Sequence, residues 1–284
     1  MISLDAATVL LQWATGGLAF LWVTTRHRMV GLGYGWLLRI VYGLMAAGAA
    51  AVGMATDPVP VRDVAAVLVV VATGVALVSS VVRRRAGVAG QQQQTERRSA
   101  RVAAMTGIER TGETPAPSGP EFDPRLDLVA PAIGLVGIVA GAVAAGGPTA
   151  LAIARTVVGA AFLGAVTDAM LLGHWYLVQP GLRRDPLREL VVATAVIWPV
   201  EVALLLVPTG MVSVLNGSID DGYGGLLGWF WTASAVTTAG LLGVTLAALR
   251  ERQYSAVMAA TGLLYLAILT AFGTDLVARA TLTG

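Results

Sequence analysis

Eight apolar runs, each about as long as the hydrocarbon core of a bilayer, restrict the fold more than any other feature of the sequence. A helix needs about 20 mostly apolar residues to cross a bilayer. The runs are residues 4–25, 33–54, 63–82, 127–146, 150–178, 188–208, 224–248 and 254–279. Because their apolar residues are continuous and do not alternate with polar ones, the runs predict helices and not barrel strands. We therefore expect an all-α, polytopic membrane bundle of about eight transmembrane helices.

The composition supports this class and excludes several kinds of chemistry. Charged residues make up 13% of the chain, whereas a soluble domain has about 25%. Cysteine and lysine are both absent, which excludes disulfides, thiolate metal sites, cysteine nucleophiles and lysine Schiff bases. The paired Asp220 and Asp221 lack the spacing of a calcium-binding EF-hand loop, and we interpret them as part of a turn. We expect no metal site and no nucleic-acid partner, predict no particular cofactor, and favour a protein that is not an enzyme.

The arginines predict the orientation of the bundle. Fifteen of them lie in four alternate segments between the apolar runs, and the other loops hold only Arg62. Arginine and lysine accumulate in cytoplasmic loops, so the four segments are expected in the cytoplasm and both termini outside. The abundance of Ala, Val, Gly, Leu and Arg is typical of GC-rich codons. We therefore expect a multi-pass protein of a bacterial cytoplasmic (inner) membrane, with the lipid bilayer as its surroundings.

One long polar segment, residues 83–126, interrupts the pattern. It contains three consecutive arginines, a run of four glutamines and a proline-rich stretch, with no hydrophobic periodicity. We interpret it as a disordered, basic cytoplasmic linker between a three-span segment (residues 1–82) and a five-span segment (residues 127–284). Its arginines favour anionic headgroups and fix the topology. The alternative is that the linker docks a soluble protein partner.

Asp168 is the strongest candidate for a functional residue, because it lies near the middle of an apolar run where a charge is expensive. Ala161 and Gly164 share its helical face, so another helix is expected to approach closely there. Asp168 is a candidate proton carrier, or a ligand for an ion or a substrate. The alternative is a structural carboxyl, protonated or paired with an arginine, that joins two helices.

His174 follows Asp168 by six residues, which places it about 120° away around the helix. Histidine can relay protons or bind haem iron. Trp175 and Tyr176 beside it suit an interfacial aromatic belt, and together with His174 they are candidates for contact with haem or a quinone. The alternative is a helix-end histidine that bonds to a carbonyl or water. The other histidine, His27, lies between two arginines, which favours the water interface.

Glu201, Asp275 and Arg155 are the remaining candidates for binding protons or substrate. Glu201 follows Pro199 by two residues, and a proline kink beside an acid is a common way for transport helices to form a site. Asp275 precedes Arg279 by four residues, which predicts an intrahelical ion pair. Arg155 lies on the outer side, against the charge bias, so it is a candidate to pair with a buried acid or to bind an anion.

Three functional classes are consistent with these residues. The first is a proton-coupled carrier of a small solute or lipid, in which Asp168 and Glu201 change protonation. The second is a membrane subunit of a redox assembly that handles quinone or haem near His174. The third is a non-catalytic scaffold or assembly factor whose linker recruits a partner. The deep carboxylates and the proline-containing helix favour the first class, and two histidines are a poor basis for haem binding.

Overall fold

The computed structural model describes residues 4–92, 96, 104, 119–179, 181–207, 210–251 and 253–282. Most of the interior of the 83–126 segment lies outside these residues, as do Pro180, Pro208 and Arg252. The described part of the chain is helical and contains no strand. Its spanning helices are α1 (Ala6–Thr25), α2 (Leu32–Thr56), α3 (Pro60–Val82), α5 (Val129–Ala144), α6 (Thr149–Val178), α7 (Asp185–Leu206), α9 (Leu226–Ala248) and α10 (Tyr254–Thr281).

Eight helices in the described ranges are long and apolar enough to cross a membrane, when α5 is taken together with the short helix η2 (Pro124–Leu128) that leads into it. This confirms the predicted all-α membrane bundle. The predicted spans and the observed helices agree to within a few residues. Two short elements complete the described chain, η1 (Arg84–Ala86) after α3 and α8 (Met211–Leu215) after α7.

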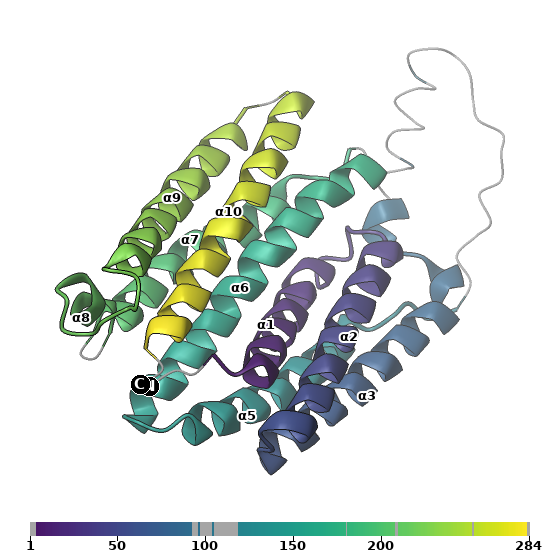
Figure 1. Ribbon diagram of the computed structural model, residues 1–284. Helices are drawn as coiled ribbons and strands as arrows, with labels where there is room; N and C mark the ends of the chain where they lie inside the picture. Colours follow the sequence, from purple (N-terminus) through teal and green to yellow (C-terminus); the bar gives the residue numbers. More distant parts are fainter. Residues whose placement is uncertain are drawn as a thin grey trace.

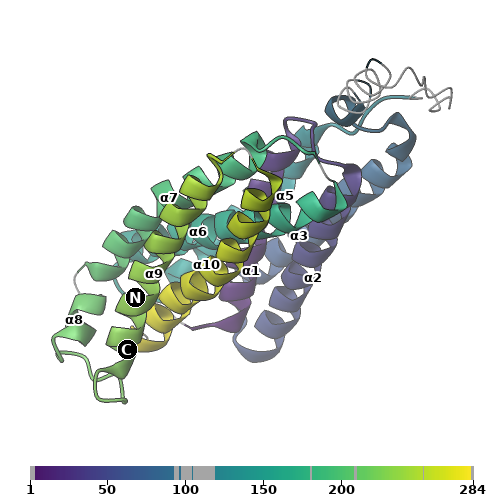
Figure 2. The ribbon, with the colours of Figure 1, turned by 90° about the horizontal axis from the view of Figure 1, so that it is seen from above.

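The helices pack as two groups of four (Figures 1 and 2). In the first bundle, α1 and α3 each contact both α2 and α5. In the second bundle, α6 and α9 each contact both α7 and α10. The 83–126 segment thus divides the sequence after three spans. The helix that follows it, α5, nevertheless packs in the same bundle as α1, α2 and α3. Whether the linker separates domains stays a prediction.

The two bundles meet mainly where α1 crosses α6. Glycines allow the backbones to touch there: a Cβ added to Gly16 would lie 1.8 Å from the carbonyl oxygen of Ala160, and one added to Gly164 would lie 2.2 Å from the carbonyl carbon of Gly16. Such close backbone contact through small residues is typical of membrane helix packing. The close approach predicted from the small residues near Asp168 is therefore observed.

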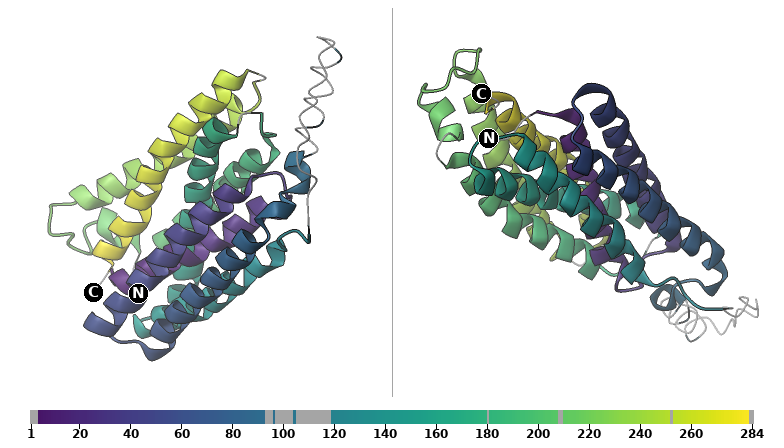
Figure 3. Two further views of the ribbon diagram at one scale, coloured as in Figure 1. Left: turned by 90° about the vertical axis from the view of Figure 1, so that its right-hand side faces the viewer. Right: turned by 90° about the horizontal axis from the view of Figure 1, so that it is seen from below.

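Both ends of the described chain lie at the same end of the molecule, and the 83–126 segment leaves from the opposite end (Figures 1 and 3). We call these the termini end and the linker end. At the termini end, Gly146 and Gly147 turn the chain from α5 into α6 with positive φ angles of 74° and 75°, a backbone region that favours glycine. Which end faces the cytoplasm stays a prediction from the arginines.

The described flanks of the 83–126 segment are attached to the loop between α1 and α2. Arg28 in that loop pairs with Glu121 at 2.7 Å, and its carbonyl accepts a hydrogen bond from the backbone of Gly90 at 3.0 Å. Arg83 donates to the carbonyl of Glu121 at 3.3 Å. The two flanks are therefore held close together at the linker end. The prediction of disorder concerns an interior that lies largely outside the described residues.

Candidate functional site

Four arginines are almost fully buried among the described helices, and each needs compensation because an isolated buried charge is expensive. They are Arg39, Arg62, Arg155 and Arg279, each 1–2% exposed. Three of them have carboxylate partners, and the arrangement around the fourth differs. An arginine that is neutralised by a bonded carboxylate has a structural role, whereas a buried arginine without such a bond indicates a candidate site.

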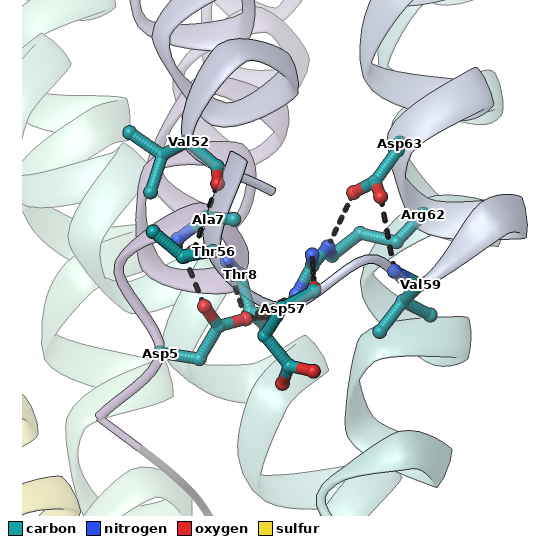
Figure 4. A network of polar contacts seen from close by, with 9 residues as sticks. All are labelled: Asp5, Ala7, Thr8, Val52, Thr56, Asp57, Val59, Arg62 and Asp63. Atoms are coloured by element: carbon teal, nitrogen blue, oxygen red, sulfur yellow. Dashed lines mark hydrogen bonds and ion pairs between the residues drawn. The ribbon is translucent and has the colours of Figure 1, made fainter. Parts of the chain in front are cut away.

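Arg62 connects the beginnings of α1 and α3 at the termini end (Figure 4). Its guanidinium pairs with Asp5 and, at 2.9 Å, with Asp63. It also donates to the carbonyl of Asp57 at 2.7 Å and to the hydroxyl of Thr8 at 3.3 Å. Asp5 additionally caps the first turn of α1 by accepting hydrogen bonds from the backbone. Arg62 is thus neutralised within the protein and has a structural role.

Arg39 forms the corresponding buried pair at the linker end. It binds both carboxylate oxygens of Asp127, at 2.8 and 2.7 Å, and its guanidinium lies 4.5 Å from the ring centroid of Phe122. The hydroxyl of Thr25 donates to the same carboxylate at 3.2 Å. This bidentate geometry holds α2 against η2 and the end of α1.

Asp275 and Arg279 form the intrahelical pair that their spacing predicts, with a distance of 2.8 Å between Nε and Oδ2. Both side chains are 1% exposed. Gln12 of α1 bridges them: its amide oxygen accepts from Arg279 at 2.5 Å and its amide nitrogen donates to Asp275 at 3.5 Å. The pair on α10 is thereby joined to the first bundle by a side chain 263 positions earlier in the sequence.

Glu201 lies beside this group and has no comparable partner. It is fully buried in α7, and neither of its carboxyl oxygens has a hydrogen-bond partner among the described residues. Arg155, Asp275 and Arg279 are all close enough to interact with it electrostatically. Arg155 instead donates to the backbone carbonyls of Leu204 at 2.9 Å and Val207 at 3.4 Å, and its Nη1 is buried without a partner in the described chain.

Gly159 of α6 is the point at which these side chains converge. A Cβ added there would lie 2.5 Å from Nε2 of Gln12, 2.9 Å from Oδ1 of Asp275 and 3.5 Å from Oε1 of Glu201. Three side chains from three other helices therefore surround one glycine. We call this group the Gln12 cluster, which consists of Gln12, Arg155, Glu201, Asp275 and Arg279.

Asp168 lies elsewhere on α6, in a second polar group. The hydroxyl of Tyr42 donates to its Oδ1 at 2.5 Å, and the hydroxyl of Tyr34 donates to its backbone carbonyl at 3.3 Å. Its Oδ2 is buried without a hydrogen-bond partner in the described ranges. All three side chains are 0% exposed. Within the described ranges no arginine pairs with Asp168, and the hydroxyl of Tyr42 bonds to its carboxylate instead. We call these three residues the Asp168 group.

Mostly apolar residues separate the two groups, although the buried Thr167 in this interval accepts a hydrogen bond from the indole of Trp13 at 3.0 Å. Asp168 follows Gly159 by nine residues, which is about 14 Å along a helix. Phe162, Leu163 and Val166 of α6 lie within this interval, and all three are 0% exposed and pack against α10. The structure therefore brings Glu201, Asp275 and Arg155 together and places Asp168 apart from them, nearer the linker end.

The side chains considered for haem or quinone point to different partners. His174 is exposed on the side of α6, with its Nδ1 3.2 Å from the hydroxyl of Tyr265. The indole nitrogen of Trp175 donates to Gln179 at 3.2 Å, and the buried Tyr176 hydroxyl donates to the carbonyl of Arg183 at 2.5 Å. These contacts position the end of α6 and the loop that follows it. A role in binding haem or quinone stays a prediction.

Two features of the site were not among the predictions from the sequence, although the sequence contains a signal for each. Gln12 is an amide within the first apolar run, and a polar residue at that depth was a signal for a buried partner. Tyr34 and Tyr42 are eight residues apart, a spacing that places both hydroxyls on one face of a helix. Neither signal indicates which helix the side chain meets.

The fold and these groups define a multi-pass helical membrane protein with two buried acid sites. Comparison with protein-family models, with curated proteins and with solved structures finds no match for this chain. Its function must therefore be inferred from the site itself.

Proposed function

We propose that the protein is a proton-coupled carrier of a small solute or lipid, in which Asp168 and Glu201 bind and release protons. One observation supports this proposal above the others. Both carboxyls are fully buried in membrane-spanning helices, and three of their four oxygens have no hydrogen-bond partner among the described residues. Such groups are costly to a structural protein and useful to one that binds protons.

Burial in a membrane protein is costly to an ionised carboxylate. An ionised carboxylate away from water needs paired charges and hydrogen bonds, and without them binding a proton relieves the cost. Asp275 has that compensation in Arg279 and Gln12. Glu201 has no hydrogen bond among the described residues, although the guanidinium groups of Arg279 and Arg155 lie near enough to stabilise its charge. Glu201 is therefore suited to exist in both protonation states, which a coupling residue requires.

The positions of the two acid groups along α6 suit a carrier in which protons reach the protein alternately from its two ends. The Gln12 cluster lies toward the termini end and the Asp168 group toward the linker end, with mostly apolar residues between them. Pro199 lies two residues before Glu201 in α7, and its missing N–H leaves the carbonyl of Ala195 without its helical donor. A helix weakened next to an acid is where a carrier is expected to move.

The test is a search for solute-driven charge movement. The purified protein is reconstituted into vesicles on a solid-supported membrane, and sugars, amino acids, carboxylic acids, small cations and short-chain lipids are applied in turn under an imposed pH gradient. We expect a current for at least one class that changes sign when the gradient is reversed. Asp168→Asn and Glu201→Gln should abolish it, whereas Asp185→Asn at the exposed start of α7 should not. Currents that persist in both buried variants, or no current for any class, would refute the carrier.

A further inference from the structure

Arg155 and Glu201 are the two charged members of the Gln12 cluster that no hydrogen bond in the described chain joins to an opposite charge. Arg155 is 1% exposed and Glu201 is fully buried. The other two charged members, Asp275 and Arg279, pair with each other at 2.8 Å. Nη1 of Arg155 and both carboxyl oxygens of Glu201 are buried without a hydrogen-bond partner among the described residues. One donor group and two acceptor atoms are therefore unsatisfied in the interior of the second bundle.

The two side chains lie near each other at the contact between α6 and α7. Arg155 reaches α7 through hydrogen bonds to the carbonyls of Leu204 and Val207, at 2.9 and 3.4 Å. Leu204 follows Glu201 by three residues, so the two lie on the same side of α7. On α6, a Cβ added to Gly159, about one turn beyond Arg155, would lie 3.5 Å from Oε1 of Glu201. The guanidinium and the carboxyl group are thus about one helical turn apart, within electrostatic reach.

The hydrogen bonds of Arg155 hold it in place without neutralising its charge. Leu204 and Val207 lie at the end of α7, where helical carbonyls have no backbone donors, and residue 208 is a proline without an N–H. The carbonyls of a helix end carry a partial negative charge of about half an elementary charge, which does not balance a guanidinium. Nε and Nη2 of Arg155 make these bonds, so Nη1 is left for a further acceptor.

The net charge of the cluster depends on whether Glu201 holds a proton. With Glu201 ionised, two arginines and two carboxylates sum to zero. With Glu201 protonated, one positive charge is in excess, on Arg155, where an unpaired buried charge is expensive. No compensating charge comes from α1, α8 or α9, which also contact α7 and contain no ionisable side chain. Within α7 itself the nearest other ionisable residue is Glu189, twelve positions away. A monovalent anion at Nη1 would restore neutrality and supply the missing acceptor.

We infer that Arg155 binds one small monovalent anion while Glu201 holds a proton, and releases the anion when Glu201 ionises. This inference rests on the proposed function, because it names the substrate class of the carrier and the residue that holds the substrate. Anion and proton strengthen each other's binding by the same free energy, since each removes the charge imbalance that the other creates. Arg155 is six residues from the beginning of α6, about 9 Å along the helix, so the anion exchanges at the termini end.

The charge balance also accounts for the current expected of the carrier. One anion and the proton on Glu201 together carry no net charge. The proton on Asp168 adds one positive charge, so movement of one anion with two protons is electrogenic.

The linkage is tested by isothermal titration calorimetry of the purified protein in detergent, between about pH 5 and about pH 9. The probes are acetate and chloride, titrated in buffers of different ionisation enthalpy, which reports the protons taken up with each anion. We expect at least one of the two anions to bind about tenfold or more tightly at the acidic limit, with up to one proton taken up. Acetate alone would assign the site to carboxylates, and chloride alone to halides.

Two variants separate the roles of the two residues. Glu201→Gln is neutral at every pH, so it should bind the anion as tightly as the unsubstituted protein does in acid, without pH dependence or proton uptake. Arg155→Gln should weaken binding about tenfold or more, because the charge and the donor are both lost. The matched control is Arg183→Gln, which changes an exposed arginine paired with Asp185 and should leave the affinity unchanged. Glu201→Gln tests the linkage even if Arg155→Gln, which loses its bonds to α7, does not fold.

Several results would overturn the inference. They are no binding of either anion to the unsubstituted protein, affinity independent of pH, loss of binding in Glu201→Gln, and unchanged affinity in a folded Arg155→Gln. Proton-linked anion binding without any solute current would support the anion site and refute the carrier. A current driven by a sugar or a cation, without binding of either anion, would support the carrier and refute the anion site.

Discussion

Gly16 of α1 and Gly164 of α6 lie against each other with backbone in direct contact, so that neither position has room for a Cβ. This contact forms the crossing at which the two bundles meet. It also brings α6 close enough to the first bundle for Tyr42, whose ring lies across Gly17, to reach Asp168.

Gly164→Ala is expected to lower the stability of the folded bundle. The added Cβ would lie 2.2 Å from the backbone of Gly16, so the helices must separate, at a cost of about 3 kcal/mol. The matched control is Gly243→Ala in α9, where an added Cβ meets nothing within 4 Å. Denaturation of the two variants in the same detergent measures the difference. Equal midpoints for both would show that the crossing does not depend on this glycine.

Arg279→Gln is expected to be the most destabilising charge change in the second bundle. It leaves Asp275 buried and unpaired, and breaking a buried ion pair in this way costs about 3–5 kcal/mol. Arg183→Gln provides the control, because Arg183 pairs with Asp185 at 2.7 Å while both side chains are more than 60% exposed. An exposed pair contributes about 1 kcal/mol or less. Similar thermal melting temperatures for the two variants would contradict the structural role of the buried pair.

Glu201→Met should leave the protein folded and abolish solute-driven currents. Glu201 makes no hydrogen bond among the described residues, so an apolar side chain of similar length removes no such bond and avoids burying a carboxyl. The melting temperature should therefore fall less than in Asp275→Asn, because the change removes only the electrostatic interactions with Arg279 and Arg155 and no hydrogen bond of the described residues. A marked fall would instead assign Glu201 a structural role, and Asp275→Asn, which disturbs the bonded pair, is the comparison that should destabilise.

Asp221 is expected to make the loop before α9 sensitive to acid. Hydrogen bonds from the backbone of Gly225, and also of Tyr223 and Leu227, hold the pKa of Asp221 below its usual value. A lowered pKa in the folded state stabilises the loop above the unfolded pKa of about 4, and this contribution is lost as the pH falls through the folded value. Hydrogen-exchange protection of the loop should therefore decrease in acid.

The comparison for this loop is between neighbouring acids. Asp221→Asn should remove much of the protection of residues 222–228 even at neutral pH, whereas Asp220→Asn should have little effect, since Asp220 accepts a hydrogen bond only from Gly222 in the described chain. Exchange rates are normalised to the intrinsic rates at each pH. The same protection in both variants would show that Asp221 does not organise the start of α9.

The sequence was sufficient to predict where the helices of this fold lie along the chain, but not which helices pack against one another. Apolar length alone located every spanning helix, and the spacing of Asp275 and Arg279 predicted their ion pair. The packing of α5 against α1 and α3 was not predictable in this way. Transmembrane helices are apolar on nearly all sides, so their periodicity does not indicate which face meets which partner.

The site was predicted as a set of residues and not as a geometry. Asp168 and Glu201 were identified because polar groups are rare at such depth, and Arg155 because it lies against the charge bias. Their partners come from distant parts of the chain, as Gln12 and Tyr42 show, and a single sequence contains no signal for pairs so far apart. Whether Glu201 is bonded depends on side-chain directions that only a three-dimensional arrangement defines.

The Asp275–Arg279 pair also bears on how the protein is assembled. The helix that contains it, α10, follows the other seven described spanning helices in the sequence, so it is synthesised after them. Because its two charges are one turn apart, they can neutralise each other while the helix enters the bilayer, before Gln12 is within reach. Asp168 enters after Tyr42 is already in place and can be bonded on arrival. The order of synthesis thus supplies Asp275 and Asp168 with a partner at the time of insertion, whereas Arg39 must await Asp127 and Arg155 must await the carbonyls of α7.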